Sequence, residues 1–278
     1  SRQTAIGLVN QQSKLDFESW KEIWCANNDI SNNNLMIEES NKYHEFTIAS
    51  ITNAELHPKL TFRLTLKPNK SVEFVSGDLL AIRPEKDGQE RLYSIGAGPK
   101  KEIVLYIKKH FLGVCSQQLA KLSENSTIEA RVVPNKKFHV PDDYESLILI
   151  ANGTGIAPFI GMAFENKLNA KIDLFWGGKS EEDYNLYKYE LLDLQALGKI
   201  RSIRTVFSQN KSQYVQGIIA ENPLEIVKAL TNGTSIMICG SIAMGQGVLN
   251  EINIICKNND LQHIEFYKET GQIKMDCY

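Results

Sequence analysis

Apolar and polar positions alternate in short segments along the first half of the chain. The segments are H-E-F-T-I-A-S-I (44–51), L-T-F-R-L-T-L (60–66), F-V-S-G-D-L-L-A-I (74–82), E-I-V-L-Y-I (102–107) and T-I-E-A-R-V-V (127–133), followed by a proline-bounded stretch at 134–141. Alternation with a period of two places successive side chains on opposite faces of a strand. Because clusters of Gly, Pro, Asn and Lys separate the segments, the pattern predicts an antiparallel sheet or barrel.

A different pattern begins near residue 146, where apolar runs alternate with helical segments. The predicted strands are 147–151, 171–177, 202–208, 235–240 and 263–267, and the clearest predicted helix, 183–198, ends at Gly198 as its C-cap. Continuous apolar runs are typical of strands buried on both faces of a parallel sheet. The expected fold class is therefore an N-terminal antiparallel β-barrel followed by a doubly wound parallel-sheet α/β domain.

The 278 residues are enough for about two domains. We expect an N-terminal extension at 1–40, with a short amphipathic helix at 14–25 and an Asn-rich linker, then the barrel at 41–143 and the α/β domain at 144–278.

Composition narrows the function mainly by exclusion. A net charge of −2 and a pI near 6.2 give no reason to expect nucleic acid or an anionic membrane surface as a partner. No apolar run is long enough to span a bilayer. The five cysteines include no C-x-x-C pair, which fits a reducing compartment, so we expect a cytoplasmic protein without a metal site.

The most informative short stretch is L-I-L-I-A-N-G-T-G-I-A-P-F (147–159). A buried strand runs through Gly153, Thr154 and Gly155 into a helix that begins near Pro158. Glycines here let backbone amides approach a phosphate, and the helix N-terminus adds positive partial charge. A turn that needs glycine only for its shape explains these residues equally well. No Gly-Lys-Ser/Thr follows, so this is not a Walker loop.

R-L-Y-S-I-G-A-G (91–98) combines an arginine and a tyrosine on one face of a predicted strand. Arg91 can pair with a phosphate while the Tyr93 ring stacks on a planar heterocycle, and Ser94 can donate a hydrogen bond to a ring nitrogen. In isolation, the exposed edge of a β-hairpin is the more common explanation of such a stretch.

H-F-L-G-V-C-S-Q-Q-L-A (110–120) offers a second candidate anion site. Gly113, Val114, Cys115 and Ser116 open a predicted helix, with Ser116 near its N-cap. A capped helix without a ligand is the simpler reading of this stretch.

Two further stretches end predicted parallel strands, where ligands of open α/β sheets bind. In T-V-F-S-Q-N-K-S-Q-Y-V-Q (205–216), Ser208, Lys211 and Tyr214 could surround a 2′-phosphate, the group that distinguishes NADP from NAD. A polar loop is the alternative. Cys239 ends the strand in M-I-C-G-S, and a small buried hydrophobe is its simpler role.

Together and in this order, the five stretches resemble the ferredoxin–NADP reductase superfamily. The resemblance covers residues 42–278 and is greatest to the FAD/NADPH reductase module of diflavin enzymes, of the sulfite reductase flavoprotein and NADPH–cytochrome P450 reductase type. It implies an NADPH-dependent flavoprotein that binds FAD and NADPH. Such an enzyme accepts hydride from NADPH and passes single electrons to a flavodoxin-like FMN domain, a ferredoxin or a similar carrier.

The resemblance also implies a role for each motif. Arg91 would contact the FAD pyrophosphate, Tyr93 would stack on the isoalloxazine, and Ser94 would lie by flavin N5. The second FAD-phosphate motif would consist of Gly113, Val114, Cys115 and Ser116. The NADP pyrophosphate would bind at the loop formed by Gly153, Thr154 and Gly155. The 2′-phosphate would bind at Ser208, Lys211, Tyr214 and Gln216. Ser94, Cys239, Asp276 and the terminal Tyr278 would be the catalytic residues, with Tyr278 also covering the flavin.

Three features depart from the family pattern. Gln209 stands where many members carry an arginine, which should weaken the preference for NADPH over NADH. The insertion that diflavin reductases carry in the barrel is missing, and the sequence contains no flavodoxin-like domain. The segment 16–24 faintly resembles the last helix of such a domain, which would make this chain a module excised from a larger protein.

Two alternatives stand beside this reading. Within the enzyme class, the chain could be a stand-alone ferredoxin or flavodoxin reductase, and from another class it could be a non-redox nucleotide-binding protein. Lys100, Lys101, Lys108 and Lys109 form either a solvated rim or a docking patch for an acidic carrier. The sequence does not indicate an oligomeric state.

Overall fold

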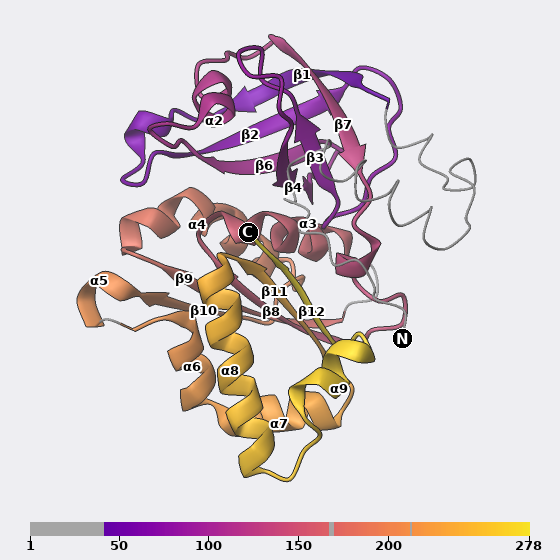
Figure 1. Cartoon of the computed structure of the whole chain (residues 1–278), viewed down its shortest axis with the longest axis vertical. Coiled ribbons are helices and arrows are strands. Elements are labelled where there is room, and N and C mark those ends of the chain that lie inside the picture. Colours follow the sequence, from indigo (N-terminus) through magenta and orange to yellow (C-terminus); the bar gives the residue numbers. More distant parts are fainter. Residues whose placement is uncertain (1–41, 167–169, 212) are drawn as a thin grey trace, which may run out of the picture.

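The structure is a computed structural model that describes residues 42–166, 170–211 and 213–278. The helix predicted at 14–25 lies outside these residues. The described chain forms two β-sheets of different kinds, and Figure 1 shows the sheet from the first half of the chain above the sheet from the second.

The first sheet is antiparallel, with its described strands in the order β4-β3-β7-β1-β2-β6-β5. The strands are β1 (His44–Ile51), β2 (Thr61–Pro68), β3 (Leu79–Ile82), β4 (Arg91–Ser94), β5 (Gly96–Ala97), β6 (Ile103–Lys108) and β7 (Thr127–Val133). β4 and β5 are the two edges of the sheet, yet only Ile95 separates them in sequence. Since one residue spans about 3.5 Å at most, the sheet must curl until its edges nearly meet. The predicted antiparallel barrel is confirmed.

The predicted strand 74–82 is shorter in the structure and begins only at Leu79. The preceding residues turn around the buried Asp78, whose carboxylate accepts the backbone N–H of Val75 at 3.0 Å and that of Asn135 at 2.8 Å. These amides are therefore satisfied by a side chain instead of a neighbouring strand. The turn brings the segment after β7 against the barrel, and that segment leads into the second half of the chain.

The second sheet is parallel, in the order β10-β9-β8-β11-β12. Its strands are β8 (Ser146–Asn152), β9 (Lys171–Gly178), β10 (Ser202–Phe207), β11 (Ser235–Gly240) and β12 (Ile273–Cys277). The helices of the described chain are α2 (Val114–Leu119) in the barrel half, then α3 (Ala157–Glu165), α4 (Glu181–Ala196), α5 (Ser208–Lys211), α6 (Val215–Glu221), α7 (Pro223–Thr231), α8 (Ile242–Asn258) and α9 (Ile264–Glu269), with short 3₁₀ turns η2 (Ala54–Leu56), η3 (Lys136–Phe138) and η4 (Gly153–Ile156).

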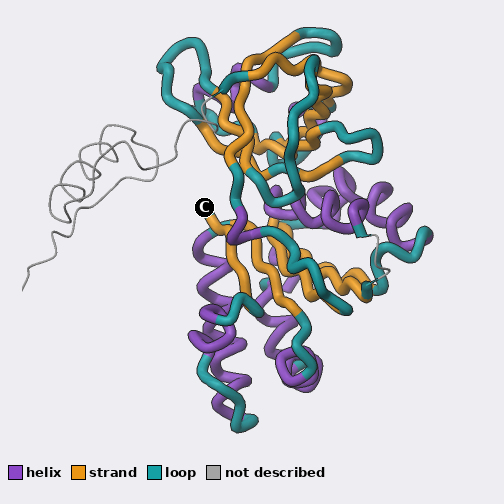
Figure 2. The backbone as a smooth tube through the Cα atoms, turned by 90° about the vertical axis from the view of Figure 1, so that its right-hand side faces the viewer, coloured by secondary structure: helices purple, strands orange, loops and turns teal. Residues whose placement is uncertain are grey.

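Both faces of the parallel sheet are covered by helices. On β8, Leu147 and Leu149 pack in one apolar cluster with α3 and α4, whereas Ile148 and Ile150 pack in another with α6 to α9. Figures 1 and 2 show the resulting layers, with α3 and α4 between the sheet and the barrel. The continuous apolar character of β8 thus has its expected cause, and the predicted doubly wound domain is confirmed.

The strand predicted at 263–267 is wrong, because this segment is helix α9. The ring of His263 accepts the backbone N–H of Glu265 and caps the helix. Ile264 and Tyr267 are both buried, at the spacing of one helical turn. The last strand is instead Ile273–Cys277, which pairs with β11 and carries the end of the chain to the edge of the sheet that faces the barrel.

The two halves of the chain meet closely where β5 packs on α3. A side chain at Gly96 would lie within 3.0 Å of the Ala157 carbonyl, and one at Gly161 within 3.0 Å of Ala97 N and Ser76 Oγ. Glycine at both positions allows backbone to pack on backbone. Within the described residues, no helix combines the length and the apolar character needed to cross a bilayer.

Candidate active site at the junction of the two sheets

The last residue of β4 and the last strand of the chain meet across the domain junction. Ser94 Oγ donates to Asp276 Oδ2 at 3.2 Å. Both side chains are mostly withdrawn from solvent, and burial raises the pKa of the Asp276 carboxyl, while its hydrogen bonds with Ser94 and Asn135 lower that pKa. The structure therefore brings together two candidate catalytic residues that lie far apart in sequence.

Cys239 lies beside Asp276 because the two residues are register partners on the parallel strands β11 and β12. Its side chain is fully buried, and this burial raises the pKa of the thiol well above its ordinary value. The thiol is thus neutral at physiological pH, and its interaction with Ser94 completes a cluster of three polar side chains.

Tyr278 continues β12 past the cluster. Its backbone N–H donates to the Gly240 carbonyl at 2.9 Å, and its hydroxyl lies 3.3 Å from Thr154 Oγ1. The residue nevertheless remains 60% exposed. A terminal ring that is fixed at its backbone and hydroxyl but open on its face can cover a planar ligand.

The glycine stretch forms a 3₁₀ turn, η4, that leads into α3 as predicted. Gly153 has φ of +51°, and a side chain at Gly155 would lie within 3.0 Å of the Cys239 carbonyl. The buried Trp176 donates its ring N–H to the Gly153 carbonyl at 3.0 Å. The loop is therefore held against the ends of β9 and β11, with Thr154 facing Tyr278.

A cavity of about 730 Å³ extends from the contact between Thr154 and Tyr278 along the ends of the parallel strands. Its lining includes Thr154 and Tyr278 at one end and Ser208, Tyr214 and Gln216 at the other. Gln216 Oε1 is buried and has no hydrogen-bond partner among the described residues, so it can accept a ligand donor. The Lys211 backbone ends α5, but its side chain lies outside the described atoms.

On the barrel side, β4 carries the residues of the first predicted FAD motif. The Arg91 guanidinium folds back onto its own loop, donating to Asp87 Oδ2 at 2.9 Å and to the Gln89 carbonyl at 2.9 Å. The Tyr93 hydroxyl interacts with the Cys115 thiol of α2, and burial raises the pKa of both groups. The two predicted FAD motifs therefore adjoin.

The predicted helix cap at Ser116 is wrong. Helix α2 begins at Val114 and its N-cap residue is Gly113, which makes no side-chain cap bond. The Ser116 hydroxyl donates to the Gly113 carbonyl at 3.2 Å and accepts the His110 N–H at 3.1 Å. A side chain at Gly113 would lie 2.6 Å from Ser116 Oγ, so crowding by this serine requires glycine at the cap.

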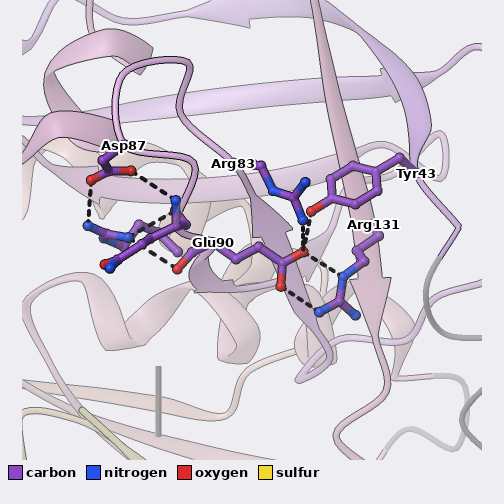
Figure 3. A network of polar contacts seen from close by, with 7 residues as sticks. Tyr43, Arg83, Asp87, Glu90 and Arg131 are labelled. Carbon is purple, nitrogen blue, oxygen red and sulfur yellow. Dashed lines mark hydrogen bonds and ion pairs between the residues drawn. The ribbon is translucent and has the colours of Figure 1, made fainter. Parts of the chain in front are cut away.

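Glu90, next to Arg91, is held by one cation of β7 and by another that directly follows β3 (Figure 3). Arg131 of β7 donates to it through Nε at 2.8 Å and through Nη2 at 2.6 Å, and Arg83 lies 3.8 Å away. The Tyr43 hydroxyl also donates to Glu90. The bond from Arg131 is the main reason why the pKa of Glu90 falls to about 2. This network fixes the backbone where β4 begins.

Several polar residues near the site were not singled out from the sequence. Asn135 hydrogen-bonds to Asp276, and Asn152 exchanges bonds with Ser241 of 3.0 and 2.9 Å that join the ends of β8 and β11. Lys274 donates to the His139 carbonyl at 2.6 Å and anchors β12 to the segment that connects the domains. Only Asn152 had a local signal, because it directly precedes the glycine turn.

The four lysines considered as a docking patch do not form one group. Lys100 and Lys101 lie in the turn before β6, while Lys108 and Lys109 lie at its other end, about 20 Å away along a six-residue strand. Lys109 is also paired with Glu55, and Lys108 lines the cavity. The lysines therefore serve two different surfaces.

Comparisons with known proteins agree with this arrangement. Residues 149–250 match the model of the oxidoreductase NAD-binding domain family. The chain is 33% identical over 162 residues to a self-sufficient cytochrome P450 monooxygenase of Oidiodendron maius, covering 52% of this chain and 15% of that protein. It is 34% identical over 134 residues to the sulfite reductase [NADPH] flavoprotein alpha-component of a Shewanella species, covering 46% of this chain and 22% of that protein.

The chain thus spans less than a quarter of the length of these curated relatives. Among solved structures, the ferredoxin–NADP+ reductase of Plasmodium falciparum superposes with a TM-score of 0.73 at 24% identity, over 87% of this chain and 98% of that one. This likeness shows the fold. Residues 149–250 thus match an oxidoreductase NAD-binding domain, and the chain has the fold of a ferredoxin–NADP+ reductase.

Proposed function

We propose that the chain is an NADPH-dependent flavoprotein reductase. Barrel residues 41–143 bind FAD, and residues 144–278 bind NADPH. The observation that carries the proposal is the contact of Ser94 with Asp276, because it joins the predicted flavin strand to the end of the predicted nicotinamide site. A nucleotide-binding protein without redox activity would not need this junction between a barrel and an α/β sheet.

The residues present fit both cofactors. On the barrel, Arg91 offers a cation at the edge of β4, and Tyr93 offers a half-buried ring next to α2. In the α/β domain, the cavity provides the η4 backbone at one end, and Ser208, Tyr214 and the unpartnered oxygen of Gln216 at the other. These groups suit a ligand with phosphates at two places and a polar base or sugar between them.

The bound cofactors supply the hydride and electron chemistry, while the protein supplies orientation and electrostatics. Ser94 directs its hydroxyl toward the junction and is held there by Asp276. The neutral, fully buried Cys239 thiol would lie beneath the rings and help to set how closely they approach. Tyr278 would shield the face of a bound flavin from water, and it would have to leave that face before a nicotinamide could stack there.

The electron acceptor is proposed to be a flavodoxin-like FMN domain or a ferredoxin. The two curated relatives favour a reductase module of a larger diflavin-type protein. The solved ferredoxin–NADP+ reductase, which the chain covers almost completely, favours the alternative of a stand-alone reductase. The four described cysteines are free thiols, which fits the proposed cytoplasmic location.

The experiment that tests the proposal starts from the purified protein. It should be yellow, release FAD on denaturation, and bleach when NADPH is added without oxygen. Reduction rates should then be compared across flavodoxins, ferredoxins and isolated FMN domains. A protein that stays colourless and cannot be reconstituted with FAD would refute the proposal.

A further inference from the structure

One carboxylate in the cavity is buried with half of its hydrogen-bonding capacity unused. Asp183, in the first turn of α4, is only 6% exposed and lines the cavity. Its Oδ2 accepts the backbone N–H groups of Lys179 at 3.1 Å and Ser180 at 3.3 Å, which caps the helix. Its Oδ1 is buried and has no hydrogen-bond partner among the described residues. A buried carboxylate oxygen without a donor is costly, so a donor from a ligand is expected there.

The Lys59 ammonium lies close to this carboxylate and to the ammonium of Lys179, the residue whose backbone N–H Asp183 accepts. Lys59 of the barrel and Lys179 at the end of β9 both line the cavity and repel one another. The barrel reaches the same point through His57, whose Nε2 lies 3.2 Å from the Asp183 backbone carbonyl. Two neighbouring lysines favour binding of an anion, whereas the unpartnered oxygen of Asp183 can accept a hydrogen bond from a hydroxyl or an amine. A phosphorylated sugar supplies both groups.

The strand order shows which sugar of a dinucleotide would lie here. β9 lies between β8, which leads into the glycine turn, and β10, which leads into Ser208. If the pyrophosphate lies over the turn after β8 and the 2′-phosphate lies at Ser208, the group opposite the end of β9 is the ribose that joins them. This ribose carries one free hydroxyl, at the 3′ position.

We propose that Asp183 binds the adenosine ribose of NADPH by accepting a hydrogen bond from its 3′-hydroxyl, while Lys59 and Lys179 attract the adjacent phosphates. This inference rests on the proposed function and adds a specificity residue to it. Asp183 selects for a ribose with a free 3′-hydroxyl. The lysines also compensate for the cation that is missing at Gln209, because the Gln209 N–H donates to the Lys179 carbonyl at 2.9 Å and so fixes the two residues side by side.

The test compares three ligands by calorimetry on the FAD-loaded protein. The ligands are NADP+, 2′,5′-ADP and 3′-deoxy-2′,5′-ADP. On the wild type, loss of the 3′-hydroxyl should weaken binding about tenfold, the usual effect of losing a hydrogen bond to a charged group. This measurement needs no protein variant, so it remains decisive even if variants fold poorly.

The variant Asp183→Asn keeps an oxygen for the helix cap and replaces the free acceptor with an amide donor. We expect it to bind 2′,5′-ADP about tenfold more weakly than the wild type but to bind the 3′-deoxy compound equally well. Glu182→Gln is the matched control, since it removes an exposed charge from the same helix turn and should change neither affinity.

Each other outcome overturns the inference. Equal weakening of both compounds by Asp183→Asn would mean that the carboxylate does not recognise the hydroxyl. If Asp183→Asn weakens the binding of NADP+ but not the binding of 2′,5′-ADP, Asp183 would lie at the nicotinamide ribose instead. If the FAD-loaded wild type binds none of the three ligands, the proposed function fails as well, whereas normal binding with no effect of the variant refutes only the role of Asp183.

Discussion

Ser94 and Asp276 are separated by 182 residues in sequence, yet Ser94 Oγ lies 3.2 Å from Asp276 Oδ2. The first residue ends an edge strand of the barrel, and the second belongs to an edge strand of the parallel sheet. The contact therefore depends on how the two domains pack, and close packing of β5 on α3 fixes that geometry. A junction of this kind can hold the reacting rings of two cofactors at one distance.

Removing the side-chain hydroxyl of Ser94 or the carboxylate of Asp276 should slow hydride transfer more than it weakens coenzyme binding. We expect Ser94→Ala and Asp276→Asn each to lower the rate of flavin bleaching by NADPH about tenfold or more, because orientation at the reacting atoms is lost. Stopped-flow reduction without oxygen measures this rate, and calorimetry measures NADP+ affinity. Ser71→Ala, at an exposed barrel position, is the control. Unchanged bleaching rates would exclude both residues from the reaction.

The pH dependence of stability should report the burial of Asp276. Burial raises the pKa of its carboxyl in the folded protein, so the folded state binds this proton more tightly than the unfolded state. Burying the charged Asp276 carboxylate lowers the free energy of unfolding. This destabilisation is absent below about pH 3.8, where the carboxyl is protonated in both states, and is fully present once the pH exceeds the raised pKa. Asp276→Asn should therefore stabilise the protein more at neutral pH than in acid. Denaturant unfolding at both pH values tests this, and a constant difference would contradict it.

Local pattern was sufficient for most strands of both sheets, because alternation and apolar runs report the burial of each face directly. It failed at 263–267, where five residues satisfy the strand and helix patterns equally well. The segment is a helix because His263 caps it and because Ile264 and Tyr267 are buried on the same side. Both features depend on tertiary packing. The same packing moves the final strand to Ile273–Cys277 and puts Asp276 in register with Cys239.

The candidate site shows the same limit. Motifs next to a glycine or an Arg-x-Tyr-Ser sequence could be found because backbone geometry or residue type marks them. Asn135 and Asp183 could not, since each acts through contacts made by distant parts of the chain. Ser116 suggested a helix cap from residue preference alone, whereas the crowded space around Gly113 determines where the helix begins.

Tyr278 should compete with the nicotinamide for the flavin face. Removing the ring in Tyr278→Ala should raise the affinity for NADP+ and NAD+ by about fivefold to tenfold, the value of a stacked aromatic contact, and should weaken discrimination against NADH. Tyr278→Phe keeps the ring and loses only the contact with Thr154, so its selectivity should stay near that of the wild type. Unchanged affinity and selectivity in Tyr278→Ala would refute the covering role.

Two glycines in helices should respond oppositely to alanine. A side chain added at Gly161 of α3 would lie within 3.0 Å of Ala97 N and Ser76 Oγ. Gly161→Ala should therefore destabilise the protein by about 3 kcal/mol. Gly217 of α6 has nothing within 4 Å, so Gly217→Ala should stabilise it by about 0.5 to 1 kcal/mol. Denaturant unfolding of both variants measures this difference. Stabilisation by both would mean that β5 and α3 are not packed as described.

The Glu90 network should stabilise the barrel in a pH-dependent way. The pKa of Glu90 is lowered from 4.5 to about 2, mainly by Arg131, so the folded state favours the charged carboxylate. Its contribution is complete above about pH 4.5 and is lost as the pH falls toward 2. Because the side chain is partly exposed, we expect Glu90→Gln to cost only about 1 to 2 kcal/mol at neutral pH. The difference from the wild type should shrink in acid, and Glu85→Gln, an exposed residue of the same loop, should show neither effect. A cost that stays the same down to pH 2 would show that the charge of Glu90 does not stabilise the start of β4.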